Sequence, residues 1–145
     1  MAITSAICTS LKQELLVGTH NFTATSGNTF KIALYTSSAS LGAGTTAYST
    51  SNEITNSSGT AYTAGGATLT SVTPTTDSTT AICDFADVSY TSASFTANGA
   101  LIYNDTQSDK AVAVIAFGSD KTVTSGTFTI QFPTADATNA IIRLA

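Results

Sequence analysis

The sequence AVAVIAF, residues 111–117, is apolar throughout and lies between two turn signals. A continuous apolar run of this length is typical of a central strand that is covered on both faces. We therefore expect residues 111–117 to form the core strand. We also expect Ile115→Asp to unfold the domain, because an unpaired buried charge is costly.

Shorter strand patterns recur on both sides of this run. Phe30, Ile32 and Leu34 alternate with the residues between them, as in a half-buried strand. The expected strands cover residues 29–35, 67–73, 79–85, 92–96, 100–103, 111–117, 121–124, 127–132 and 139–144. About eight short strands at such spacing predict an all-β domain, either a β-sandwich or a jelly-roll-like fold, rather than alternating βαβ units.

Turn-forming residues separate these patterns. Asn98-Gly99 and Gly118–Asp120 predict turns, as does Asn104–Asp109. Ser125-Gly126 predicts a two-residue hairpin between the strands at 121–124 and 127–132. Pro74 predicts that the strand before it ends there or lies at a sheet edge, because proline cannot donate to a strand ladder.

Residues 1–18 predict one N-terminal helix, from about Ser5 to Val17. Ile7, Leu11 and Leu15 recur every four residues and form one apolar stripe. Ser5 is expected to cap the start of this helix and Gly18 to end it. Two interpretations stay open at this point: the stripe covers one end of the sandwich, or it docks on a neighbouring subunit.

Residues 36–66 form a long segment rich in Ser, Thr, Gly and Ala. A compact domain seldom keeps so long an irregular stretch without a function for it. We therefore expect an extended arm or large loop that lies on a partner, with Tyr48, Ile54 and Tyr62 as its apolar contact points. Together with Ile7, Leu11 and Leu15, these side chains are the predicted interface.

The composition suits a single domain over residues 1–145 that packs against other proteins. Charged residues make up 10% of the 145 residues, the net charge is −4, and Ser and Thr supply about a third of the chain. A surface of hydroxyls and amides favours broad packing between subunits, although a secreted domain with a polar, uncharged surface fits as well.

The five basic residues are scattered, so we expect no nucleic-acid ligand. No apolar run is long enough for a membrane span, and no secretory signal is apparent.

The sequence predicts no catalytic site and no enzyme activity. His20 is the only histidine, and the abundance of Ser and Asp in the chain carries no information, so we expect His20 to be either structural or merely exposed. Asp84 and Asp87 could form a carboxylate pair, but a glycosidase cleft is usually lined with aromatics and the chain has no Trp. We expect Asp87 instead to accept hydrogen bonds from turn backbone groups.

No metal or cofactor site is expected either. Asp105 and Asp109 flank a turn that lacks the glycine and the terminal glutamate of a calcium loop, which favours a solvated hairpin tip. Cys8 and Cys83 are predicted to be two buried thiols, with a disulfide left open. Gly65-Gly66 is predicted to allow a sharp turn into the next strand rather than to bind phosphate.

Four stretches resemble a family of small virion proteins of tailed bacteriophages. They are FKIALYTSSASLGAGTTAYSTSNEI (30–54), TAYTAGGATLTSVTP (60–74), GALIYND (99–105) and AVAVIAFGSDKTVTSGTFTIQFP (111–133), which together cover most of the chain. The resemblance implies a virion component that is assembled in the cytoplasm of the bacterial host. It implies self-assembly rather than chemistry, and it carries no residue with an assigned role.

Within a virion, this resemblance favours a capsid decoration (cement) protein, a compact β-domain that is often trimeric. Its partners would be other virion proteins, above all the major capsid protein. The first alternative is a tail, baseplate or fibre-associated protein. The second is a receptor- or carbohydrate-binding module, in which Tyr48, Tyr62 and Tyr90 would stack on sugar.

Overall fold

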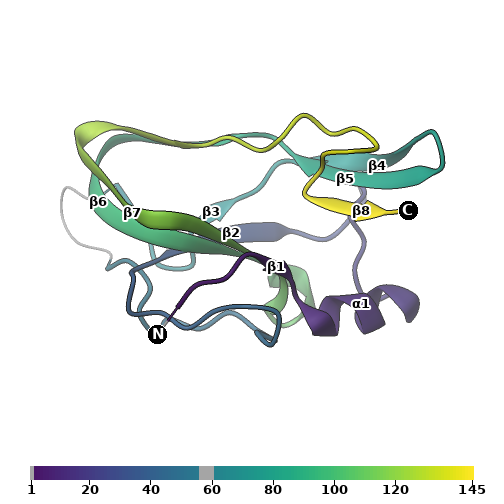
Figure 1. Cartoon of the computed structure of the whole chain (residues 1–145), viewed down its shortest axis with the longest axis horizontal. Coiled ribbons are helices and arrows are strands. Elements are labelled where there is room, and N and C mark those ends of the chain that lie inside the picture. Colours follow the sequence, from purple (N-terminus) through teal and green to yellow (C-terminus); the bar gives the residue numbers. More distant parts are fainter. Residues whose placement is uncertain (1, 56–60) are drawn as a thin grey trace.

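The fold is mostly β, with two antiparallel sheets and one short helix (Figure 1). The structure is a computed structural model that describes residues 2–55 and 61–145. Residues 56–60 of the predicted arm therefore lie outside the described residues. The elements are β1 (Ala6–Ile7), α1 (Thr9–Leu16), β2 (Phe30–Tyr35), β3 (Ala67–Thr68), β4 (Ser71–Asp77), β5 (Thr80–Phe85), β6 (Val88–Asn104), the 3-10 helix η1 (Asp105–Gln107), β7 (Lys110–Ile130) and β8 (Ile142–Leu144). The predicted all-β fold class is confirmed.

The two sheets have five and three strands. The larger one has the order β1-β7-β6-β2-β3, and the smaller one has the order β4-β5-β8. Pro74 lies in β4, an edge strand whose pairing with β5 is irregular between Val72 and Thr75. Of the two predicted positions for Pro74, the end of a strand or a sheet edge, the structure shows the second.

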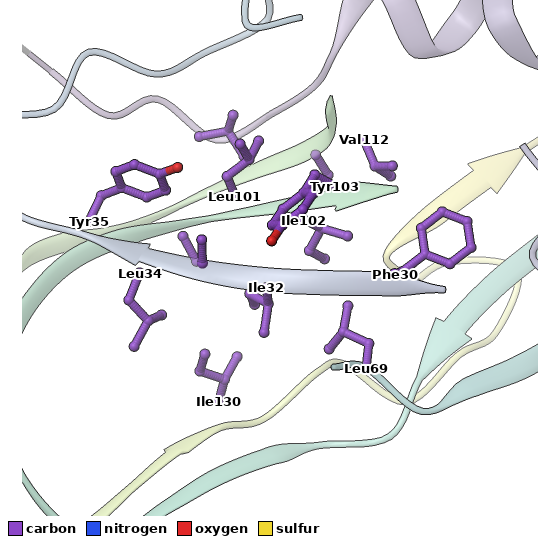
Figure 2. Packing of buried hydrophobic residues seen from close by; sticks show 14 of the residues in the cluster. Phe30, Ile32, Leu34, Tyr35, Leu69, Leu101, Ile102, Tyr103, Val112 and Ile130 are labelled. Atoms are coloured by element: carbon purple, nitrogen blue, oxygen red, sulfur yellow. The ribbon is translucent and has the colours of Figure 1, made fainter. Parts of the chain in front are cut away.

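The core is built on the middle of the larger sheet. β6 pairs with β2 on one side and with β7 on the other, so its residues 99–104 have a strand on both sides. In Figure 2, Ile32 and Leu34 lie on one face of this sheet, and Leu101 and Val112 lie on the other. All four side chains are fully buried, so the sheet is covered on both faces. Residues 30–35 were predicted to form a half-buried strand. In the structure β2 is buried at every residue except Lys31, which is partly exposed.

The five strands predicted between residues 92 and 132 belong to two long strands, β6 and β7. β6 has 17 residues and β7 has 21, and they form one hairpin whose tip is η1. The predicted turn at Asn104–Asp109 is confirmed as this tip, whereas the predictions of turns at Asn98-Gly99 and Gly118–Asp120 and of a hairpin at Ser125-Gly126 are wrong.

These three glycine-containing sites instead mark irregularities inside the hairpin. The register changes from Ala97↔Lys121 to Gly99↔Ala116, so a single β6 residue lies opposite residues 117–120 of β7. Asn98 donates a hydrogen bond of 2.8 Å to Asp120 across this irregularity. Bulges bend strands and raise their twist, and in Figure 1 both long strands curve back over the larger sheet at the left of the view. Turn-forming residues thus bend the hairpin without ending its strands.

The N-terminal helix is shorter than predicted. α1 begins at Thr9 after Cys8, because residues Ala6–Ile7 pair with β7 instead of joining a helix. Ser5 does not cap α1; its hydroxyl accepts a hydrogen bond of 2.8 Å from the backbone N–H of Ala116. The predicted end is confirmed, since Gly18 adopts a φ of 74° and donates to the carbonyl of Leu15.

The apolar run at residues 111–117 is only partly a core strand. Ala111 to Val114 are buried, but Ile115, Ala116 and Phe117 are partly exposed. Ile115 and Phe117 line an open groove, so their side chains stay partly in contact with water. The expectation that Ile115→Asp unfolds the domain therefore no longer holds, because a charge at this site can still reach water.

Candidate functional site

The feature most suited to binding is an open groove along β7. It has a volume of about 780 Å³ and is mostly apolar. Its walls come from β1, from both halves of the bent strand β7, and from the C-terminal segment. The apolar side chains that line it and remain partly exposed are Ile7, Ile115, Phe117, Phe128 and Ile141.

The groove lies beside a free strand edge. β1 occupies the outer edge of β7 at Ala113 and Val114, and the Ser5 hydroxyl takes the N–H of Ala116. From Phe117 to Ile130, no strand in the described part of the chain pairs with this edge. Unpaired edges readily accept another strand, and large apolar patches on a soluble protein mark interaction sites.

Two charged residues stand on this edge. Asp120 and Lys121 are adjacent and exposed, and they are the only charged residues between Ile115 and Ile130. The ion pairs among residues 2–55 and 61–145 are His20–Glu14, Lys31–Asp105 and Lys110–Glu14. Neither Asp120 nor Lys121 is therefore held in an ion pair by any residue that the structure describes.

Glu53 anchors the described part of the 36–66 segment to the sheet. Its carboxylate accepts hydrogen bonds from Tyr48 (2.7 Å), Tyr62 (2.6 Å) and the backbone N–H of Gly65 (2.7 Å), and Glu53 is 7% exposed. Burial, together with the hydrogen bond to Glu53, raises the pKa of both phenols, so they remain donors at neutral pH. This segment therefore packs on its own domain, at least over residues 36–55 and 61–66.

Gly65-Gly66 has the predicted structural role. Both glycines have positive φ, 92° and 81°, and Ala67 starts β3 directly after them. A Cβ on Gly66 would lie 1.9 Å from the carbonyl oxygen of Ile32, so no larger residue fits without a backbone shift.

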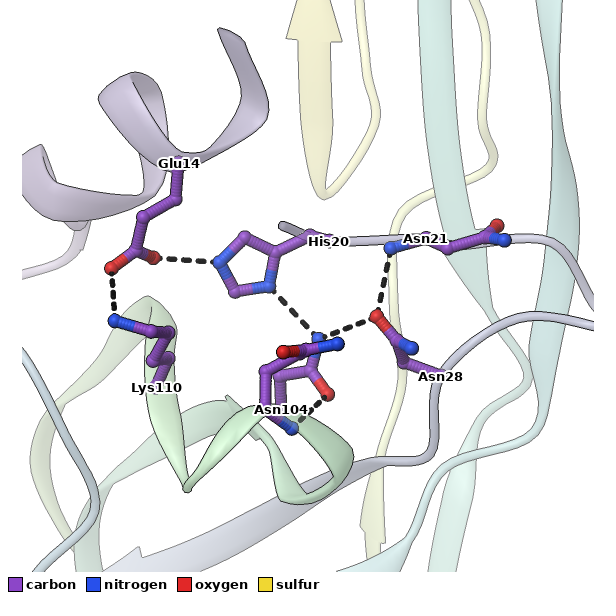
Figure 3. A network of polar contacts seen from close by, with 7 residues as sticks. Glu14, His20, Asn21, Asn28, Asn104 and Lys110 are labelled. Carbon is purple, nitrogen blue, oxygen red and sulfur yellow. Dashed lines mark hydrogen bonds and ion pairs between the residues drawn. The ribbon is translucent and has the colours of Figure 1, made fainter. Parts of the chain in front are cut away.

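A second polar network ties α1 to the hairpin tip (Figure 3). His20 lies between Glu14, at 2.7 Å from Nε2, and the Asn104 amide nitrogen, at 2.9 Å from Nδ1. Asn104 also accepts a hydrogen bond from the N–H of Gln107, which orients its NH₂ toward His20. In this arrangement Nδ1 accepts, so Nε2 carries the ring proton and donates it to Glu14. Lys110 donates to the other carboxylate oxygen of Glu14 at 2.9 Å.

This network has the bonding of a structural brace. The side chain of His20 is 0% exposed, and its ring nitrogens are occupied by Glu14 and Asn104. A general base must reach a substrate proton, and a nucleophile must lie within its reach. Of the two alternatives expected for His20, structural or merely exposed, the structure shows the first.

The Glu14 carboxylate makes the stability of the brace depend on pH. Burial opposes its ionisation, but the hydrogen bonds from His20 and Lys110, together with the charge of Lys110, outweigh burial and lower the pKa of Glu14 below its ordinary value of 4.5. A folded-state pKa below the unfolded one stabilises the fold above about pH 4.5, and this contribution is lost as the pH falls through the lowered value.

We expect Glu14→Gln to be less stable than the wild type at neutral pH and to approach it in acid. The measurement is the free energy of unfolding in urea from pH 7 to pH 3. The gap between the two proteins should shrink below about pH 4.5, where the wild-type carboxylate becomes protonated. An equal gap at every pH would show that the Glu14 charge does not stabilise the fold.

The six predicted interface residues lie mostly inside the domain. Leu11, Ile54 and Tyr62 are 0%, 5% and 1% exposed, so no partner can reach them in this fold. Ile7, Leu15 and Tyr48 are partly buried against the core. Only Ile7 lines the groove, and whether it contacts a partner remains a prediction. The stripe of the N-terminal segment thus packs on its own sheet.

The groove residues of β7 were not identified as interface residues from the sequence. Phe128, Ile130 and Phe132 alternate with polar residues, and this period of two correctly indicated a strand. The pattern cannot show which edge of that strand lacks a neighbour. That information depends on the bend of the hairpin and on the shortness of β1.

The remaining candidates have structural surroundings. Asp87 accepts a hydrogen bond of 2.8 Å from the backbone N–H of Phe132, as the sequence predicted.

Cys8 and Cys83 are free and buried. Burial raises their thiol pKa values to about 11 and about 12, so both stay protonated at neutral pH. Asp105 pairs with Lys31 at 3.3 Å. In the described residues, no group of three or more His, Cys, Asp or Glu side chains is arranged to hold a metal ion.

No known protein family, characterised protein or solved structure matches the chain. The resemblance to tailed-phage virion proteins therefore stays a prediction from the sequence. None of the helices that the structure describes has the length and hydrophobicity needed to cross a bilayer.

Proposed function

We propose that the protein is a structural component of a tailed-bacteriophage virion, in the role of a capsid decoration protein. The observation that carries the proposal is the apolar groove beside the free edge of β7, because such a surface is suited to packing against another subunit. The low content of charge supports it, since few charged groups would lose water in the contact. The sequence resemblance to virion proteins supplies the phage context.

The alternative of a carbohydrate-binding module has less support. Tyr62 and Tyr90 are 1% and 8% exposed, and Tyr48 stacks on Tyr103 with ring centroids 4.6 Å apart. These rings are therefore already packed against other side chains of the domain and offer no open platform to a sugar. A tail, baseplate or fibre-associated position remains the alternative within the virion, since the same groove would serve there.

The proposal is tested on purified particles of a phage that encodes this chain. We expect mass spectrometry to find the protein in many copies per particle and electron microscopy to place it on the outer surface of the head. Particles without it should still assemble but release their DNA at lower temperature. Absence from the particle would overturn the virion role, and density confined to the tail would replace decoration by the tail alternative.

A further inference from the structure

The ring of His20 lies in a network whose hydrogen-bond directions are fixed by the backbone (Figure 3). A backbone N–H can only donate, so the N–H of Gln107, at 3.2 Å, fixes the position of the oxygen of the Asn104 side chain. In the same way, the N–H of Asn21, at 2.9 Å, fixes the oxygen of Asn28, and this oxygen accepts from the Asn104 NH₂ at 2.9 Å. Both side-chain amides are therefore held in one orientation by donors that cannot change their role.

This arrangement leaves His20 only one place for a proton. The Asn104 NH₂ donates to Nδ1 at 2.9 Å, so Nδ1 must accept, while Nε2 donates to Glu14 at 2.7 Å. A second proton, on Nδ1, would face the NH₂ group, donor against donor, at a side chain that is 0% exposed. Turning the Asn104 amide over would bring its oxygen against that of Asn28 and its NH₂ against the N–H of Gln107. The hydrogen bonds of the fold therefore accommodate only the neutral ring.

The charges around the ring do not remove this conflict. On α1 and β7, the carboxylate of Glu14 is shared between His20 and Lys110, whose ammonium lies 2.9 Å from the other oxygen. On β2 and η1, Lys31 and Asp105 pair with each other at 3.3 Å. Both carboxylates thus have a lysine of their own, and neither supplies a free charge that would attract a second proton. Two uncharged aromatic rings stack on the imidazole, namely Phe22 and Phe30.

We propose that the contact between His20 and Asn104 is an acid-sensitive latch, which holds the connection between α1 and β2 on the hairpin tip only while the ring is neutral. His20 and Asn28 lie in that connection, and Asn104 is the last residue of β6, where η1 begins. A second proton on the ring breaks the contact to Asn104 and releases the connection. The backbone hydrogen bond of 2.9 Å from Asp105 to Thr29 does not involve the ring, so the tip keeps this tie to the start of β2. The latch does not depend on the proposed virion role.

The direction of the effect follows from proton uptake. A histidine in contact with water takes up its second proton near about pH 6.5, whereas the closed latch has no place for that proton. The open form therefore binds one more proton than the closed form, and its population rises about tenfold for each pH unit below this value. The latch is closed at neutral pH and weakens in mild acid. Glu14 acts in a separate window, below about pH 4.5.

The test is amide hydrogen exchange, measured by NMR from about pH 7.5 to about pH 5, with each rate divided by that of an unstructured peptide at the same pH. We expect the protection of the Asn21 and Gln107 N–H groups to fall by about tenfold or more over this range, because both bond to an amide that the latch holds in place. Nitrogen-15 shifts of the His20 ring should show the proton on Nε2 at neutral pH.

Asn104→Asp is expected to reverse the effect. Its carboxylate still accepts from Gln107 and offers the second oxygen to a doubly protonated His20, so the protection of the Gln107 N–H should rise as the pH falls. Asn52→Asp is the matched control, since it makes the same change at an exposed residue whose hydrogen bond to Thr36 comes from the backbone carbonyl. We expect it to keep the pH dependence of the wild type.

Three results would overturn the latch. They are a ring that carries a proton on Nδ1 at neutral pH, wild-type protection at Asn21 and Gln107 that does not change over this pH range, and a folded Asn104→Asp variant with the pH dependence of the wild type. The first two are measured on the wild type, so they decide the matter even if Asn104→Asp does not fold.

Discussion

Ile102→Asp is expected to leave the protein unfolded at room temperature. Ile102 is 0% exposed and lies in β6 between Ile32 of β2 and Ala113 of β7, so a carboxylate there would have no path to water. An unpaired charge in such a place, together with the lost apolar contacts, costs upward of about 4 kcal/mol. Small domains are stable by only about 5–15 kcal/mol, so most of the stability would be lost.

The measurement is the far-ultraviolet circular dichroism and urea midpoint of Ile102→Asp beside Ile115→Asp. The two variants introduce the same charge on neighbouring strands, at residues that face the core and the groove respectively. We expect Ile115→Asp to remain folded, because its side chain is partly exposed. Equal unfolding of both variants would show that the groove is closed in the isolated chain.

Glu53→Ala should have the second-largest effect, a loss of about 3–5 kcal/mol. The carboxylate accepts from two phenols and one backbone N–H, and its removal leaves all three donors without this acceptor in a buried place. Each such loss costs about 1–3 kcal/mol when the group stays dry, although relaxation and water entry recover part of it. The segment around Tyr48 and Tyr62 should then detach from the sheet before global unfolding.

Hydrogen exchange measures this loosening at the N–H groups of Ile54 and Gly65. Glu53→Gln is the matched control, because its amide oxygen can still accept two of the three hydrogen bonds and the Tyr48 hydroxyl can rotate to accept from the NH₂. We expect it to lose much less stability than Glu53→Ala. Equal losses in the two variants would mean that one acceptor oxygen on a side chain of the same size is not enough, and that the fold needs the complete carboxylate of Glu53.

The sequence predicted most strands by their local patterns, but it missed β1, which was expected to be helical, and the lengths of the longest two strands. Residues 100–103, 111–117 and 127–132 all carry strand patterns, and all but residues 131–132 lie in β6 or β7. The glycine and asparagine residues that separate these segments fit a turn and a bulge equally well. Whether Asn98-Gly99 reverses the chain or bends it depends on whether β7 supplies a partner on the other side, which is a long-range fact.

The functional site was the least predictable part. Ile54 and Tyr62 looked like contact points for a partner because they are isolated apolar residues in a polar segment, yet Glu53 and the sheet hold that segment against its own domain. Glu53 itself gave no signal, since a lone glutamate in a loop is usually solvated. The groove residues were recognised as strand residues, but their exposure was not foreseen.

The amino-acid sequence by itself determined the fold class, because alternation, turn residues and low charge are local properties that any compact arrangement of this chain must respect. It also predicted that Cys8 and Cys83 are buried thiols, which the structure bears out. Only the tertiary structure decided which surface stays open. Burial is a property of pairs of segments distant in the chain, and the open edge exists because the two residues of β1 cover a strand of 21.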